Sequence, residues 1–128
     1  MTIELQMLVW SAALALVQML VAVVGAQTQL GLPMLAGNRD SMPILTGWAG
    51  RARRAHINML ESLVLFAILV LTAKAAGISN GMTLLGAQLF FWGRAAYALV
   101  YVAGIPWLRT LVWAVAVAGM LLIFSCLF

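Results

Sequence analysis

The chain has 128 residues, of which 66% are hydrophobic and 8% are charged, and its mean hydropathy is +1.11. Soluble domains carry about 25% charged residues, so this composition excludes an ordinary soluble domain and predicts an integral membrane protein. In a membrane protein the net charge of +4 indicates how the chain is oriented rather than a nucleic-acid partner, because Lys and Arg are retained on the cytoplasmic side.

Four stretches are apolar over the roughly 20 residues that a helix needs to cross a bilayer. They predict transmembrane helices at about 5–26, 47–75, 82–104 and 107–128. The second and third connections are short, which makes the helices that they join antiparallel neighbours. The predicted fold is therefore an all-α integral membrane protein, a four-helix up-down bundle that forms a single domain over residues 1–128.

The distribution of basic residues predicts how this bundle is oriented. Four arginines lie in or just after the first connection and one follows the third, whereas the second connection has only Lys74. Connections one and three are therefore expected to be cytoplasmic, with both termini on the opposite side. The first helix is expected to be retained rather than cleaved as a signal, because it carries Glu4 in place of a basic leader and its apolar run is too long.

The segment GRARRAHINMLES is expected at the cytoplasmic front of the second helix. At 100° per residue, four of its polar residues share an arc of about 80°: Arg51, Arg54, Asn58 and Glu61. His56 points to nearly the opposite side. If this helix leaves the membrane near Ala73, Asn58 and Glu61 lie about 8 to 12 Å inside the hydrocarbon.

The third helix carries a second polar stripe, formed by Arg94, Tyr97 and Tyr101, on a face about 60° wide and at similar depth. Ionisable groups inside a membrane usually face the bundle interior and are paired, so we expect Glu61 and Arg94 to approach one another in a pocket open to the cytoplasm. Two structural interpretations remain open. The arginines of the second helix could anchor it to headgroups, and the deeper polar residues could fix helix register. His56 has no second ligand at metal-binding spacing, so no metal site is expected.

These residues resemble a known family. The patterns Arg-x-x-Arg-x-x-x-Asn-x-x-Glu in RARRAHINMLE and Arg-x-x-Tyr-x-x-x-Tyr in the third helix are similar to those of the MAPEG family, the membrane-associated proteins in eicosanoid and glutathione metabolism. Chain length and the four apolar stretches agree with it. The segment GNRDSMPILTGWAGRA resembles the bacterial branch of the family, which implies a bacterial inner membrane.

The resemblance implies a homotrimer that binds glutathione, as co-substrate, between subunits near the cytoplasmic face. The glutathione-binding positions that it implies are Arg51, Arg54, His56, Asn58, Glu61, Arg94, Tyr97 and Tyr101. His56 would face the neighbouring subunit. Arg109 and Thr110 are implied as catalytic residues close to the thiol, and a lipophilic molecule would arrive from the bilayer.

The expected activity is that of a glutathione-dependent transferase or peroxidase acting on lipophilic electrophiles. Arginines suit the carboxylates of glutathione, and a cation beside the sulfur favours the nucleophilic thiolate. A non-catalytic lipid-binding member of the family is the alternative, because a fold does not settle activity. A small four-helix multidrug exporter is disfavoured, since the acid of the first helix is Glu4, at its start rather than midway.

Overall fold

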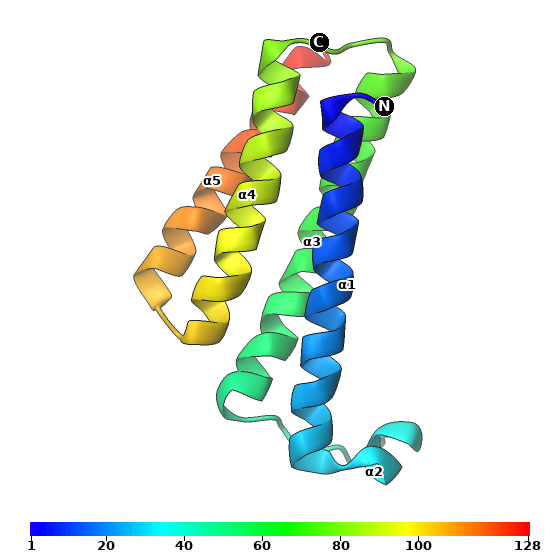
Figure 1. The fold of residues 1–128 in the computed structure, drawn as a ribbon, viewed down its shortest axis with the longest axis vertical. Helices are drawn as coiled ribbons and strands as arrows, with labels where there is room; N and C mark the ends of the chain where they lie inside the picture. The colour runs from blue at the N-terminus through cyan, green and yellow to red at the C-terminus, as the bar shows by residue number, and fades with distance from the viewer.

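The computed structural model describes residues 1–128, and all of its regular structure is helical (Figure 1). Its helices are α1 (Ile3–Leu30), α2 (Leu32–Ala36), α3 (Gly47–Ala75), α4 (Gly81–Ala103) and α5 (Pro106–Cys126). The ends of the four long helices differ from the predicted ranges by at most four residues, the largest difference being at the end of α1. The short helix α2 was not predicted; it begins at the Leu32–Pro33 step, where proline suits a first helical turn.

Three of these helices, α1, α3 and α5, are long and apolar enough to cross a membrane by length and composition. The fourth long helix, α4, spans 23 residues but is not among them. Arg94 and Gln88 lie within it and lower its mean hydropathy. The all-helical architecture and the apolar spans agree with the prediction of a membrane protein, and the hydropathy criterion supports three spans.

The long helices form two pairs (Figure 1). Helix α1 packs along α3, and α4 packs along α5; α1 and α3 also contact α4, while α1 and α5 do not meet. Both chain termini lie at one end of the molecule, and α1 and α4 diverge toward the other end, where α2 and the connection to α3 lie (Figure 1). We call these the terminal half and the splayed half of the bundle.

The terminal half is closely packed. The rings of Phe66 and Phe90 stack with their centroids 3.9 Å apart, and both side chains are fully buried. The backbones of α4 and α5 meet at Gly86 and Gly119, where a Cβ atom on Gly86 would lie only 2.5 Å from the Gly119 carbonyl oxygen. Small residues that allow backbones to approach are the usual basis of helix association in membranes.

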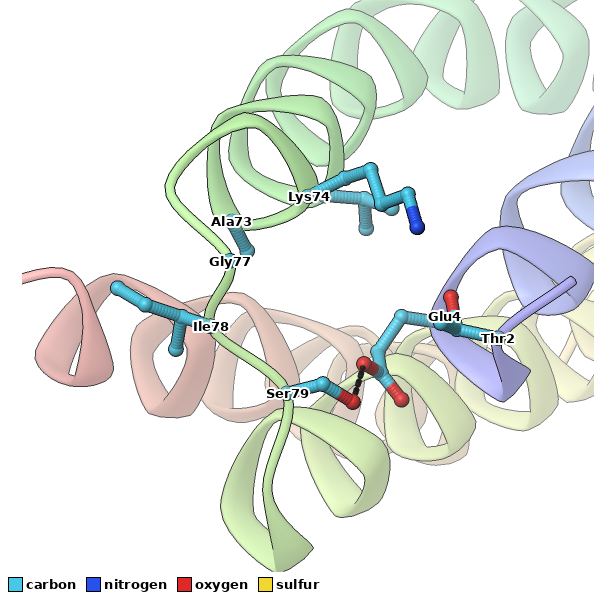
Figure 2. Close-up of a pocket in the computed structure, with 8 residues that line it drawn as sticks. Thr2, Glu4, Ala73, Lys74, Gly77, Ile78 and Ser79 are labelled. Carbon is cyan, nitrogen blue, oxygen red and sulfur yellow. Dashed lines mark hydrogen bonds between the residues drawn. The ribbon is translucent and has the colours of Figure 1, made fainter.

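The turn between α3 and α4 also joins the start of α1 to this half. Figure 2 shows the Ser79 hydroxyl donating to the buried Glu4 carboxylate, with an oxygen–oxygen distance of 2.7 Å. Glu4 lies in the first turn of α1, where the helix dipole favours a negative charge. A small pocket of about 120 Å³ separates Glu4 from Lys74 at the end of α3. The turn itself is fixed by Asn80, which caps α4.

Candidate functional site

The polar stripe of α3 faces α4 and α5, and three helices meet at Tyr101. Arg54 Nε of α3 donates to the Tyr101 hydroxyl at 3.1 Å. Arg109 Cζ of α5 lies 4.7 Å from the centroid of the same ring, and Arg54 Cζ lies 5.9 Å from it. Two guanidinium groups therefore share one tyrosine ring by cation–π attraction. Neither donates a hydrogen bond to a carboxylate, so two positive charges lie here without an acidic partner within the chain.

A second layer lies deeper along the same helices, around Arg94. Arg94 is only 1% exposed; its Nη1 donates to Asn58 Oδ1 at 2.8 Å, and its Cζ lies 4.0 Å from the Tyr97 ring centroid. The Arg94 Nε and Nη2 groups have no hydrogen-bond partner. The Tyr97 and Tyr101 rings lie edge to face at 5.5 Å and connect the two layers. A buried arginine with unpaired donors is costly and is typical of functional positions in membrane proteins.

The expected approach of Glu61 to Arg94 is wrong within this chain. Asn58, about one helical turn before Glu61, occupies the position beside Arg94, and Glu61 is exposed and makes no hydrogen bond. The axial offset of α3 and α4 places Asn58, rather than Glu61, level with the Arg94 guanidinium. The Glu61 carboxylate is therefore free to meet a positively charged group from outside the chain.

Arg51 and Thr110 lie at the edge of this cluster. Arg51 Nε donates to the Val102 carbonyl oxygen at 2.9 Å, so its cation sits at the end of α4, where the helix dipole is negative. The Thr110 hydroxyl is exposed and donates to the Pro106 carbonyl oxygen within its own helix, at a long 3.4 Å. Its position next to Arg109 is the only link that the structure gives it to the cluster.

The structure places His56 on a different face of α3, away from the other predicted site residues. It lines a pocket of about 430 Å³ between α1, α2 and α3, together with Arg39 and Arg53. Its Nδ1 atom is buried and has no partner. Arg39 adopts a positive φ of 62°, and its Nε donates to the Leu35 carbonyl oxygen at 2.7 Å. Within one chain, six of the eight predicted glutathione-binding residues therefore lie on α4 or contact it from α3, whereas Glu61 is exposed and His56 lies on a different face.

Sequence reasoning also missed a buried polar residue on α1. Gln18 is only 8% exposed, and neither atom of its amide has a hydrogen-bond partner. A signal was present in the sequence, since Gln18 lies seven residues after Ser11 on a stripe that otherwise holds Ala15, Ala22 and Ala26, all of them buried. A glutamine on such a stripe of small residues is directed into the bundle.

Apolar helices long enough to cross a bilayer, with a charged cluster held between them, define an integral membrane protein. The chain matches the family model of the MAPEG family over residues 7–128, which is nearly its whole length. The protein therefore belongs to the MAPEG family, which includes glutathione transferases and related membrane proteins. No curated protein and no solved structure matches the chain.

Proposed function

We propose that this protein is a glutathione-dependent transferase or peroxidase that acts on lipophilic electrophiles in the membrane. The observation that carries the proposal is the pair of guanidinium groups at the Tyr101 ring, with Arg54 hydrogen-bonded to the tyrosine hydroxyl. Membership of a family that includes glutathione transferases supports it.

The groups of the cluster are complementary to those of glutathione, which has two carboxylates, one ammonium and one thiol. Arg54 and Arg109 are suited to the carboxylates or the sulfur, because guanidinium forms strong charge-assisted hydrogen bonds to anions. The exposed Glu61 carboxylate has no partner of its own and would receive the ammonium. Asn58 and Tyr97 hold Arg94 beneath this site.

The proposed chemistry needs a thiolate, and Arg109 is the residue that we assign to stabilise it. A cation beside a thiol favours the ionised form, which is the nucleophile. In a transfer reaction the sulfur forms a bond to an electrophilic carbon while a leaving group departs or the adjacent atom takes up a proton. In a peroxidase reaction two glutathione molecules become a disulfide while a hydroperoxide is reduced to an alcohol and water. Thr110 would assist only after its hydroxyl leaves the Pro106 carbonyl.

The proposal extends to the arrangement in the membrane. We place α4 as a fourth span, because an arginine within a span is tolerated when it is buried in the bundle and hydrogen-bonded, as Arg94 is. Both termini would then be non-cytoplasmic, in a bacterial inner membrane. In a homotrimer, the face that carries His56 would be free to meet the Tyr101 cluster of a neighbouring subunit.

Glutathione binding to the detergent-purified protein, measured by calorimetry, tests the proposal. Arg54→Ala and Glu61→Ala are expected to weaken binding at least tenfold, because each removes a charge that pairs with the ligand. Lys74→Ala is the control, since this exposed lysine lies at the opposite end of α3, beside the pocket at Glu4. It removes one positive charge from the same helix without touching the Tyr101 cluster.

Two results would count against the proposal. Absence of binding at millimolar glutathione would reject the transferase and favour the non-catalytic lipid-binding alternative. Equal weakening by Lys74→Ala and Arg54→Ala would show a general effect of positive charge rather than a site at Tyr101. If binding is found, Arg109→Gln should reduce the ultraviolet absorbance of bound thiolate at saturating glutathione, which separates its role in ionisation from a role in affinity.

A further inference from the structure

A second pocket lies between α1 and α4, against the first half of α3. In the splayed half of the bundle, where α1 and α4 diverge, a groove of about 540 Å³ opens between them. Its floor is formed by small side chains of α3 and α4 and its walls by larger aliphatic ones. The floor includes Ala52, Ala55, Ala95 and Ala98, and the walls include Val17 and Leu99.

Gln18 is the one polar residue that lines this groove. It is more than nine-tenths buried, and both its Oε1 and its Nε2 lack a hydrogen-bond partner. A buried amide without partners is strongly destabilising, and such a group in a native fold calls for an explanation. The terminal torsion of a glutamine side chain is soft, so the amide is able to turn toward an occupant of the groove.

The depth of Gln18 restricts what the occupant is. The residue lies about 22 Å from the start of α1 and about 18 Å from its end at 1.5 Å per residue, and therefore near the middle of the bilayer. Phospholipids and fatty acids keep their oxygen atoms at the headgroups, so their chains offer nothing to an amide at this depth. A helix of a second copy has its backbone groups already paired, and the side chains that these helices expose are mostly apolar, so they offer the amide few partners. The fitting partner is a small apolar molecule with an oxygen in its body.

We propose that the groove between α1 and α4 is a binding site for a neutral lipophilic molecule that carries a carbonyl or hydroxyl oxygen. Its volume and its apolar lining with one polar group are those of ordinary small-molecule sites. The Gln18 amide donates from Nε2 to a carbonyl oxygen or accepts a hydroxyl at Oε1. The site shares no lining residue with the Tyr101 cluster, although Val102 of the groove accepts a hydrogen bond from Arg51.

Photolabelling of the full detergent-purified chain with an alkyl benzophenone tests this site. The probe is itself a lipophilic ketone, and labelled peptides from α1 and α4 are identified by mass spectrometry. Two competitors, fluorenone and fluorene, differ only by a carbonyl group. Fluorenone is expected to suppress labelling at about tenfold lower concentration, which corresponds to one hydrogen bond to a previously unpaired amide.

Two variants connect the result to the groove. Gln18→Leu should bring the two competitors to equal potency while leaving labelling in place, and it should not lower the thermal stability, since it removes an unpaired buried amide. Ala95→Phe fills the groove and should reduce labelling of α1 and α4 at least tenfold. Ala114→Phe makes the same change at an exposed position of α5 and should have no effect.

The outcomes against the proposal are equally specific. Equal competition by fluorenone and fluorene in the wild-type protein would show that Gln18 does not contact the ligand. Labelling that persists in Ala95→Phe would place the ligand elsewhere on the surface. Absence of label from α1 and α4 in the wild-type protein would mean that the groove is closed by a second copy or by lipid. Each of these results overturns the site.

Discussion

The terminal and splayed halves of the bundle differ in how closely their helices pack and in how many buried polar atoms lack a partner. The terminal half has one such atom, the Ser11 hydroxyl, and the others lie in the splayed half. In the terminal half, Gly86 lies against Gly119, Phe66 stacks on Phe90, and Ser79 hydrogen-bonds the buried Glu4. In the splayed half, Arg94 and Gln18 keep donors and acceptors without partners, and the two pockets of about 540 and 430 Å³ lie there.

This difference follows from the physics of helix association in lipid. The hydrophobic effect does not drive apolar helices together in a bilayer, so close contact of small residues is the main source of affinity. Within each pair of helices that contact is available, between α4 and α5 at Gly86 and Gly119 and between α1 and α3 at Gly25 and Ala49. The stacked Phe66 and Phe90 and the hydrogen bond from Ser79 to Glu4 join the two pairs in the terminal half. This leaves α1 and α4 free to diverge in the splayed half, where polar groups await a ligand.

The largest expected effect comes from breaking the terminal half at Gly119. A valine there would drive its Cβ into the backbone of α4 at Gly86 and Phe90, where no flexible side chain can yield. We expect Gly119→Val to lower the free energy of unfolding by about 3 kcal/mol or more. Unfolding in mixed micelles measures this effect. Ala118→Val, at an exposed neighbouring position of α5, is the control, and a comparable loss there would contradict the assignment.

The sequence predicts the position of the polar residues of α3 better than their partners. Helical periodicity alone groups Arg54, Asn58 and Glu61 on one side and His56 on another, because these directions depend only on a rotation of 100° per residue. Whether Asn58 or Glu61 meets Arg94 depends on the axial offset of two helices, and an offset of a few Å decides it. The sequence alone does not contain that offset.

The same reason explains the other features that were missed. Hydropathy is a local property, so the apolar stretches in the sequence predict the bounds of the long helices closely. The depth of α4 in the membrane remains a prediction. The groove at Gln18 arises from the divergence of α1 and α4, which no single helix pattern encodes. The short helix α2 depends on a tertiary contact, since Leu35 is buried with Ala26 and Leu45.

A smaller effect is expected from breaking the polar layer of the splayed half. Asn58→Leu removes the only hydrogen bond of the buried Arg94 guanidinium, and we expect a loss of about 2 kcal/mol in the free energy of unfolding. The double variant Asn58→Leu/Arg94→Met should recover at least half of this loss, because the unpaired charge is then gone. A double variant that is less stable than Asn58→Leu would show that the Tyr97 contact of Arg94 stabilises more than its hydrogen bond does.

The smallest loss of stability is expected at the end of the terminal half, where the turn before α4 contacts the start of α1. Ser79→Ala removes one hydrogen bond to the Glu4 carboxylate, and we expect a cost of about 1 kcal/mol. Because the contact joins only the first turn of α1 to the turn before α4, faster hydrogen exchange should be confined to the first residues of α1. Ser125→Ala is the matched control, since that hydroxyl donates only to the Leu122 carbonyl in its own helix. Faster exchange throughout α4 and α5 in Ser79→Ala would instead mean that this contact, and not the glycine packing, holds the terminal half together.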